Sequence, residues 1–227
     1  GPKWESKPVT PPNDKDLAAI LTAAKGDRLE ALIVLAITTG MRQGELFALE
    51  WQDVDLTTRL LTVRQSLEEV QGRLALKEPK SKAGYRTVKL PAVAVDALTR
   101  HREREAKIGG TVFTDADGKW LRKSNFLRKT WQPILEKAGL EGVRFHDLRH
   151  AHVSSLITAN VHAKVIQRRL GHSSITVTMD RYGHLMRDDD VAADATEAAF
   201  AALPKAGGYT VATNDPETAS VAVSDAS

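Results

Sequence analysis

The sequence contains no cysteine and few aromatic residues. Without cysteine, disulfide scaffolds, thiolate zinc sites, iron–sulfur clusters and cysteine nucleophiles are excluded. Aromatic residues make up only 5% of the 227 residues. The longest apolar run, Ala31 to Ile37, is far shorter than the roughly 20 residues of a membrane span. We therefore predict a cytoplasmic globular protein without a membrane partner, in keeping with 42% apolar and 27% charged residues.

The charges are unevenly distributed along the chain. Residues 188–227 carry eight acidic side chains against one base, Lys205, so residues 1–187 carry a net charge of +10 although the whole chain carries only +3. A basic body with an acidic tail is typical of a domain that binds a polyanion. On charge alone, an ordinary solvated surface is an equally good explanation. The opening Gly1-Pro2 is typical of a cleaved expression tag, so we expect a fragment of a longer protein.

Apolar periodicity predicts an α+β fold that is mostly helical and has a small three-stranded antiparallel sheet. Alternation at Leu61 and Val63, and again at Val88 and Leu90, indicates strands whose turns lie at Gly72 and at residues 80–84. Gly40 is expected to end a helix that is apolar nearly all round. Helices are expected over residues 14–24, 29–37, 42–49, 92–107, 123–138, 146–158, 161–170 and 175–181. Asn13-Asp14 is expected to cap the first of them.

The C-terminal part of the chain divides into two segments. Residues 188–203 have an acidic first turn, much alanine, and only Phe200 and Leu203 as large apolar side chains. This composition predicts a helix that docks on the body or on a neighbouring subunit. We expect residues 1–12 to be tag scar and linker, 13–187 to be the main domain, 188–204 to be the docking helix, and 205–227 to be a disordered acidic tail.

The densest group of functional residues is the segment 146–150. On a helix, His146 and Arg149 share one face, where an imidazole and a guanidinium can address one phosphate. His146 and His150 also approximate the zinc motif H-E-x-x-H, but Asp147 replaces the glutamate and no third ligand stands out. The phosphate interpretation is favoured, and a zinc hydrolase that uses His146 and His150 is the weaker alternative.

Five further residues have simple structural explanations when each is taken alone. Arg42 and Glu45 can form an ion pair at a helix start, and Lys80 can be an ordinary surface lysine. His172 follows a glycine at a helix end, and Tyr182 lies beside a polar cluster, where its hydroxyl can simply face water. Basic residues that suit contacts with a DNA backbone are Lys82, Arg86, Lys119, Arg122, Lys123, Arg128 and Lys129, although solvated faces explain them nearly as well.

Taken together in order, these segments resemble the catalytic domain of the tyrosine recombinases, the phage integrase family. The resemblance covers about residues 10–203 and rests on five segments, each of which is weak or moderate alone. They are residues 39–46 (TGMRQGEL), Lys80 in its turn, residues 146–150 (HDLRH), residues 170–173 (LGHS), and Tyr182 followed by Gly183-His184. The order matches the family's pattern of Arg, Lys, His-x-x-Arg, His and Tyr in full.

The resemblance implies DNA strand cleavage and rejoining without metal or cofactor. Tyr182 would attack the scissile phosphate to form a 3′-phosphotyrosine link, while Arg42 and Arg149 brace the phosphate oxygens. Lys80 would protonate the departing 5′ oxygen, and His146 would accept the tyrosine proton. A catalytically silent DNA-binding module and a topoisomerase-like nicking and closing enzyme are the alternatives in this class.

The resemblance also implies supporting residues and partners. His172 would donate a hydrogen bond to a phosphate oxygen, Glu45 would orient Arg42, and His150 would pack beneath the site. Double-stranded DNA is the expected partner, on which a homo-tetramer would assemble through the helix at 188–203. A monomer in the absence of DNA is compatible with this scheme. The family's usual N-terminal DNA-clamping domain is not present in these residues, so we expect weaker DNA binding than that of a longer parent protein.

Overall fold

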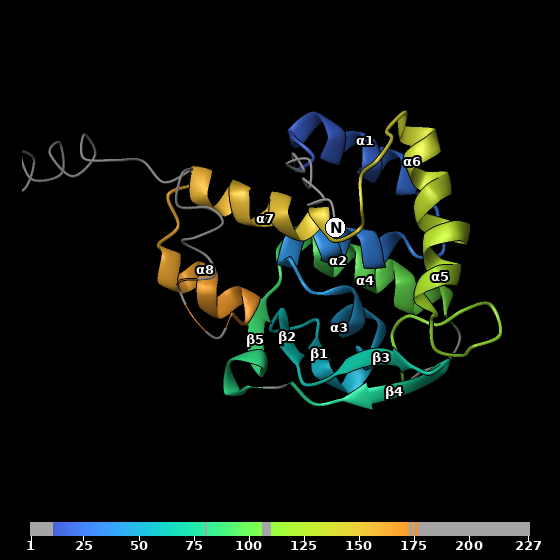
Figure 1. Cartoon of the computed structure of the whole chain (residues 1–227), viewed down its shortest axis with the longest axis horizontal. Coiled ribbons are helices and arrows are strands. Elements are labelled where there is room, and N and C mark those ends of the chain that lie inside the picture. Colours follow the sequence, from blue (N-terminus) through green and yellow to red (C-terminus); the bar gives the residue numbers. More distant parts are fainter. Residues whose placement is uncertain (1–10, 80, 106–109, 173, 175, 177–227) are drawn as a thin grey trace, which may run out of the picture. The chain divides into compact units, whose positions relative to one another are not determined.

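The computed structural model describes residues 11–79, 81–105, 110–172, 174 and 176, which all belong to one compact unit (Figure 1). The first helix, α1 (Asp14–Ala24), begins with a capping box. The Asn13 side chain accepts hydrogen bonds from the backbone nitrogens of Lys15 and Asp16, and the Asp16 carboxylate accepts one from the Asn13 backbone. This confirms the helix start that was predicted at Asn13-Asp14.

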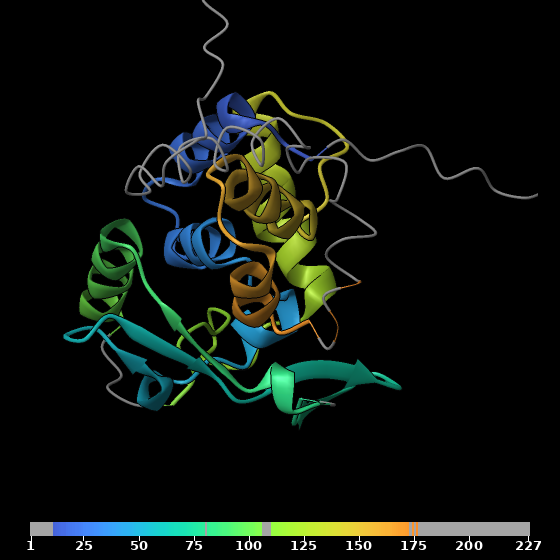
Figure 2. The same ribbon diagram turned by 90° about the vertical axis from the view of Figure 1, so that its left-hand side faces the viewer.

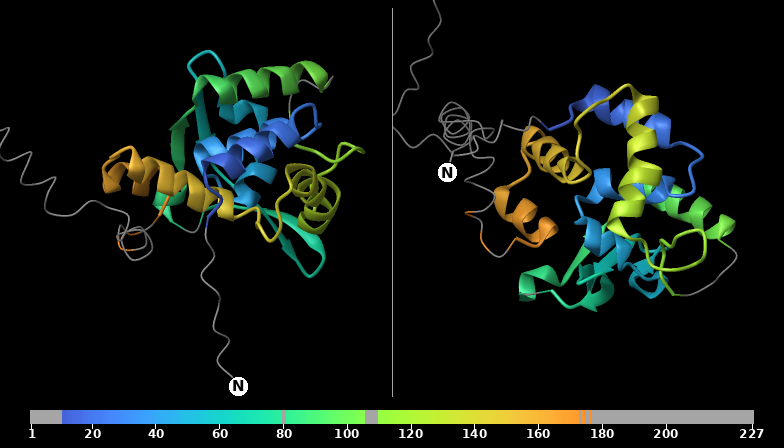
Figure 3. Two further views of the ribbon diagram at one scale, coloured as in Figure 1. Left: turned by 90° about the horizontal axis from the view of Figure 1, so that it is seen from above. Right: turned by 45° about the vertical axis from the view of Figure 1, so that its right-hand side comes forward.

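Helix α2 (Glu30–Thr39) is the centre of the helical layer. It packs against α1, α4 (Ala92–Arg104) and α7 (Asp147–Thr158), and seen from above it lies between α4 and α7 (Figure 3). Six consecutive residues from Ala31 to Ala36 are buried, as the apolar run predicted. Gly40 ends the helix in the left-handed conformation, with φ +63°, as expected for this glycine.

The strands lie together on one side of the helices (Figures 1 and 2). Strands β1 (Val54–Asp55), β2 (Leu60–Val63) and β5 (Arg86–Lys89) form the three-stranded antiparallel sheet that was predicted, in the order β1-β2-β5. Leu61 pairs with Val88 across β2 and β5, and both side chains are buried. The alternation at these positions therefore identified the inward face of the sheet correctly.

A second sheet was not predicted. Strands β3 (Ser66–Val70) and β4 (Arg73–Lys77) form a hairpin whose turn, Gln71-Gly72, has positive φ at both residues. The turn at Gly72 is confirmed, but the strands on either side pair only with each other. The hairpin packs against the short helix α3 (Gln43–Phe47). An added Cβ at Gly44 would lie 2.7 Å from the backbone carbonyl oxygen of Leu67, which cannot rotate away, so only glycine permits this approach.

The later helices follow the predictions with small shifts at their ends. The segment predicted at 123–138 is continuous but consists of α5 (Lys123–Phe126), a π-helical stretch (Leu127–Trp131) and α6 (Gln132–Ala138). Helix α7 and α8 (Ala163–Leu170) are confirmed to within two residues, whereas α4 ends at Arg104, before the predicted residue 107. The helices predicted at 175–181 and 188–203 fall outside the described residues, apart from residue 176.

Within the part of the chain that the structure describes, no helix combines the length and the apolar content needed to cross a membrane. Helix α8 packs with the C-terminal half of α7 in a small apolar cluster, whereas the other described helices share one large core. Its largest fully buried side chains include Phe113, Phe126, Leu32 and Leu98. Phe126 packs edge to face against Phe47 of α3 and against Phe145 just before α7, so the core joins the segments that carry Arg42 and His146.

Replacement of Gly40 by alanine is expected to destabilise the protein more than the same change at Gly139. Both glycines end a helix with φ between +63° and +68°, so both alanine variants carry a left-handed strain of about 1 kcal/mol. At Gly40 the new methyl group would also lie 2.7 Å from the His152 Cδ2 atom, whereas Gly139 has nothing within 4 Å. This clash should add about 1–3 kcal/mol, measured as the free energy of unfolding in urea. Equal losses in the two variants would contradict the prediction.

Candidate active site

Arg42 lies where α2, α3 and the hairpin meet. Gly40 ends α2, the Met41 side chain is buried, and Arg42 then begins α3 with its own side chain 44% exposed. The left-handed turn at Gly40 thus directs the chain so that a buried residue is followed by an exposed guanidinium. Arg42 is therefore both anchored through its backbone and able to meet a ligand from solvent.

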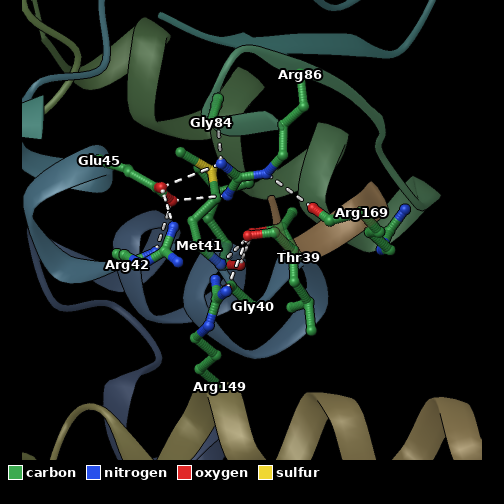
Figure 4. A network of polar contacts seen from close by, with 11 residues as sticks. Thr39, Gly40, Met41, Arg42, Glu45, Gly84, Arg86, Arg149 and Arg169 are labelled. Atoms are coloured by element: carbon green, nitrogen blue, oxygen red, sulfur yellow. Dashed lines mark hydrogen bonds and ion pairs between the residues drawn. The ribbon is translucent and has the colours of Figure 1, made fainter. Parts of the chain in front are cut away.

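The carboxylate of Glu45 joins Arg42 to Arg86 (Figure 4). Arg86 donates from Nη1 to Glu45 Oε1 at 3.0 Å and from Nη2 to Oε2 at 2.7 Å. Arg42 donates from Nη1 to Oε1 at 2.9 Å and from its backbone nitrogen to Oε2 at 2.8 Å. Each oxygen of Glu45 therefore accepts two hydrogen bonds, and the carboxylate itself is only 6% exposed. This arrangement fixes the guanidinium of Arg42 from behind.

The charge state of Glu45 follows from these partners. Burial alone would raise the pKa of Glu45, but the hydrogen bonds and the charge of Arg86, followed by those of Arg42, lower its pKa to about 2. Glu45 is thus ionised at every pH at which the protein is expected to work. The Glu45 carboxylate therefore neutralises the buried charge of Arg86 and also binds the half-exposed guanidinium of Arg42.

Arg86 does not lie on the surface. It was predicted to contact a DNA backbone, but its side chain is only 3% exposed. Besides pairing with Glu45, it donates from Nε to the Arg169 carbonyl at 2.8 Å and from Nη1 to the Gly84 carbonyl at 3.2 Å. This corrects the prediction of an exposed DNA contact, because the Arg86 side chain is buried and is directed toward Glu45 and two backbone carbonyls.

Arg149 is also buried, in the first turn of α7. Its Nη1 donates to the Gly40 carbonyl and its Nη2 to the Leu170 carbonyl, at 2.8 Å (Figure 4). Two segments of the predicted site, at Gly40–Arg42 and at Leu170–His172, are thereby tied to the third, on α7. The segments that the sequence placed far apart therefore meet around one side chain.

His146 lies at the start of α7 and is exposed. Desolvation, followed by the charge of Arg149, lowers the pKa of His146 below its ordinary value, which favours the neutral imidazole. Its ring packs edge to face against that of His150, with 5.0 Å between the centroids. Asp147 between them is engaged by Arg144, at 2.8 Å from Nη2 to Oδ1. Among the described residues no group of three His, Asp or Glu side chains can hold a metal ion, so the zinc alternative gains no third ligand there.

His172 follows the C-terminal end of α8. Gly171 has φ +68°, and a Cβ at this position would lie 2.9 Å both from the Ala83 carbonyl oxygen and from Arg86 Nη1. Only glycine therefore allows the end of α8 to approach the turn at Lys82–Gly84. Gln167 holds the next residue by donating from Nε2 to the His172 carbonyl at 3.2 Å. This explains the glycine of the Leu-Gly-His segment in physical terms.

Two adjoining pockets are lined by the predicted site residues. The first, of about 410 Å³, is lined by Arg42, Glu45 and His172, together with Pro79 and Ser81. The second, of about 550 Å³, shares Arg42 and also includes Lys123 and His146. Arg42 thus lies between a pocket that contains His172 and one that contains His146. Lys80 and Tyr182, the predicted proton donor and nucleophile, lie outside the described residues.

The other predicted DNA contacts are at the surface. Five of them are exposed, namely Lys119, Arg122, Lys123, Arg128 and Lys129. Arg122 is also tied to the hairpin, because its Nη1 donates to Glu69 Oε1 at 2.5 Å and to the Gly72 carbonyl at 3.0 Å. Lys82 begins the short turn at Lys82–Gly84.

Sequence reasoning missed a pair behind the site, which consists of the buried His152 and the partly buried Arg169. Arg169 donates from Nε to His152 Nε2 at 3.2 Å and from Nη2 to the Thr38 carbonyl at 3.1 Å. Desolvation, followed by the charge of Arg169, lowers the pKa of His152 to about 4, despite a hydrogen bond to the Ile37 carbonyl that raises it. His152 therefore accepts from Arg169 as a neutral imidazole. The only signal in the sequence was a histidine in the middle of an apolar helix face.

His152 should make stability fall as the solution becomes acidic. Above pH 6.5 the imidazole is neutral in the folded and unfolded states, so its contribution is fully present. Between pH 6.5 and about 4 only the unfolded chain takes up the proton, and this costs up to about 3 kcal/mol of folding free energy. Urea unfolding at pH 7.5 and 4.5 should show a larger loss for the wild type than for His152→Gln. The same loss in both would refute this assignment.

The fold is that of the catalytic domains of tyrosine recombinases. The solved structure of the Tn1549 transposon integrase in complex with a circular intermediate DNA has a TM-score of 0.74 at 20% identity, covering 87% of this chain and 68% of that one. The catalytic domain of bacteriophage HP1 integrase has a TM-score of 0.56 at 20% identity, covering 87% of this chain and 96% of that one. At these identities the likeness concerns the fold.

The sequence comparison gives the family. The model of the phage integrase family matches residues 13–188, and the chain belongs to that family. A tyrosine recombinase XerC-like protein of Caldanaerobacter subterraneus subsp. tengcongensis is 35% identical over 196 residues, which are 77% of this chain and 50% of that protein. The ICEBs1 integrase of Bacillus subtilis is 32% identical over 161 residues, which are 66% of this chain and 43% of that protein. The chain thus spans about half the length of the curated relatives it matches.

Proposed function

We propose that this chain carries the catalytic centre of a site-specific DNA recombinase that cuts and rejoins DNA through a 3′-phosphotyrosine intermediate. The observation that supports it best is the junction around Gly40, where buried Arg149 and the Glu45-held Arg42 meet the segment that carries His172. A phosphodiester that is cleaved without metal needs fixed positive charge beside its oxygens. Arg42, which is anchored and half exposed, can supply such a charge.

The other steps are assigned to the remaining residues of the predicted set. The Tyr182 oxygen forms a bond to phosphorus while the bond to the 5′ oxygen breaks, and Lys80 gives that oxygen its proton. His146 takes the tyrosine proton, which agrees with its lowered pKa, since only a neutral imidazole can accept one. His172 donates a hydrogen bond to a phosphate oxygen. Rejoining reverses these bonds, so no cofactor and no net energy source is required.

Double-stranded DNA is the proposed substrate. Lys119, Lys123, Arg128 and Lys129 are exposed, and Lys123 also lines the second pocket. They can pair with phosphates of a DNA backbone, so we expect binding that weakens with salt. The Tn1549 integrase and the XerH recombinase have been solved in complex with DNA, which supports the same partner for this chain. We propose that residues 13–187 form the catalytic domain and that assembly into a tetramer on DNA uses residues 188–204.

Covalent trapping tests the proposed chemistry. The protein is incubated in EDTA with a pool of nicked duplexes, denatured with detergent, and any peptide linked to DNA is mapped by mass spectrometry. We expect an adduct on Tyr182 that Tyr182→Phe abolishes and Tyr85→Phe leaves intact, because Tyr85 is exposed and outside the predicted set. An adduct that survives Tyr182→Phe, or cleavage that needs a divalent metal, would contradict the proposal. DNA binding without any adduct would favour the silent binding module.

Assembly is tested separately. Light scattering coupled to size exclusion, with and without the trapped duplex, should show a change from a smaller species to a tetramer. A chain that ends at Arg187 should bind DNA but fail to assemble. A truncated chain that still forms the tetramer would overturn the role proposed for residues 188–204.

A further inference from the structure

One buried guanidinium joins three parts of the candidate site. Arg86 of β5 donates to Glu45 of α3, to the Gly84 carbonyl in the turn before β5, and to the Arg169 carbonyl near the end of α8. Its Nε, Nη1 and Nη2 are all engaged, at distances of 2.7–3.2 Å. Such a planar fork with several donors is the property that distinguishes arginine from lysine.

Arg86 acts on Arg42 through Glu45. The two guanidinium groups share the Glu45 carboxylate, with Arg42 on its exposed side and Arg86 on its buried side. Arg86 holds the carboxylate with two hydrogen bonds, which fixes the plane of its oxygens. The direction of the Arg42 side chain is therefore set by a residue that Arg42 does not itself contact in this network.

The same side chain sets the place of the segment before His172. Arg86 Nε binds the carbonyl of Arg169, and the backbone of Gly171 passes so close that an added Cβ would lie 2.9 Å from Arg86 Nη1. A movement of Arg86 would thus displace the end of α8 and the orientation of Arg42 together. Both Arg42 and His172 line the 410 Å³ pocket. Arg86 therefore helps to set their separation across it, together with Arg149, which ties Gly40 to Leu170.

We propose that Arg86 is a positioning residue for the cleavage step, which holds Arg42 and the His172 segment in register and does not contact DNA. This inference rests on the proposed function. It assigns to Arg86 an effect on the rate of DNA cleavage that is transmitted through Glu45. Because Arg86 is buried, its loss should change the rate of the bound complex rather than the affinity for the duplex. A displacement of about 1 Å at a reacting centre can cost about a hundredfold in rate.

The first test needs no DNA. The titration of the Glu45 carboxyl carbon is followed by NMR in the wild type, in Arg86→Gln and in Arg100→Gln, whose exposed pair with Glu30 lies outside the site. The charged groups that face Glu45 are Arg42 and Arg86, and the titratable groups that share its pocket are Glu68, Glu78 and His172. Loss of Arg86 should move the Glu45 titration to higher pH, and Arg100→Gln should not. An unchanged titration in Arg86→Gln would overturn the inference.

The second test measures cleavage in a single turnover, with protein in excess over the duplexes recovered by trapping. Arg86→Gln should lower the rate by about 10²-fold while the dissociation constant changes less than about threefold. Arg86→Lys should recover part of the rate, because it keeps the charge but not the fork. In a Glu45→Gln background the further loss caused by Arg86→Gln should nearly vanish, since both residues act on Arg42 along one path.

The outcomes separate the two proposals. Equal losses in affinity and rate would identify a DNA contact, and fully additive losses with Glu45→Gln would identify a general structural role, so either result overturns the inference. Thermal unfolding of each variant shows whether it is folded at the assay temperature. If Arg86→Gln is unfolded there, Arg86→Lys replaces it in the rate and affinity measurements. If the wild type itself forms no adduct, the proposed function fails, while the Glu45 titration still decides whether Arg86 holds the carboxylate.

Discussion

Replacement of Glu45 by alanine is expected to lower the free energy of unfolding by about 3–5 kcal/mol. The change leaves the guanidinium of Arg86 buried, at 3% exposure, without the carboxylate that compensates it. Loss of one partner costs more in a buried ion pair than in an exposed one. In the interior no water is available to solvate the charge that remains. Urea unfolding at pH 7 measures the difference.

Asp53→Ala is the matched control for this prediction. Asp53 is as buried as Glu45, but its partner Arg64 is 62% exposed, with 2.7 Å between Arg64 Nε and Asp53 Oδ1. Water can solvate Arg64 after the change, so the loss should be markedly smaller. The double variant with Glu45→Ala and Arg86→Met should recover much of the stability that Glu45→Ala alone loses, because it removes both buried charges. A loss at Glu45 no greater than that at Asp53 would contradict the role of the buried pair.

Arg42→Gln should reduce the rate of DNA cleavage by about 10²–10³-fold, with little effect on stability. The side chain is 44% exposed, so its removal empties little of the core, while Glu45 keeps its stronger partner Arg86. The expected loss is therefore in the stabilisation of charge on the reacting phosphate. Single-turnover cleavage of the trapped duplex, compared with urea unfolding of the same variant, separates the two effects.

Arg64→Gln controls for the loss of an arginine that is paired with a buried carboxylate. Like Arg42 it is exposed and holds such a group, but it lies outside the two pockets. Its cleavage rate should stay within about twofold of the wild type, in line with the small effects typical of exposed sites. Arg42→Lys should fall between the wild type and Arg42→Gln, because a point charge replaces a two-pronged donor. Similar rates for Arg42→Gln and Arg64→Gln would remove Arg42 from the proposed mechanism.

Local patterns in the sequence predicted the parts of the fold that depend on neighbouring residues. The apolar run before Gly40, the cap at Asn13, and the alternation at Leu61 and Val88 each depend on a few adjacent positions, and each is confirmed. The hairpin β3–β4 was not predicted as a sheet of its own, because four of its ten strand residues are charged and the apolar alternation is short. The π-helical stretch at Leu127–Trp131 has no comparable signal in the spacing.

The charge network of the site could not be predicted from local patterns. Arg86 follows a basic turn at the start of β5, and nothing in the sequence around it distinguishes a buried arginine from an exposed one. Its burial depends on Glu45, 41 residues earlier, and on the Arg169 carbonyl, 83 residues later. The same holds for His152, whose neutral state is set by its burial and then by the charge of Arg169, because both lower its pKa. Motif order suggested the residues of the set, whereas the contacts between them depend on tertiary packing.

The hydrogen bonds that join the end of α2 to α7 and α8 have a consequence for how the protein is made. Arg169 binds the Thr38 carbonyl across 131 residues, and Arg149 binds the Gly40 carbonyl across 109. Contacts of such long sequence separation form late in folding, since a long loop must close before they contribute. A nascent chain on the ribosome holds Arg42 early but cannot lock the junction around it until α8 has emerged. Synthesis and assembly of the candidate site are thus coupled, because an incomplete chain lacks the contacts that join α2 to α7 and α8.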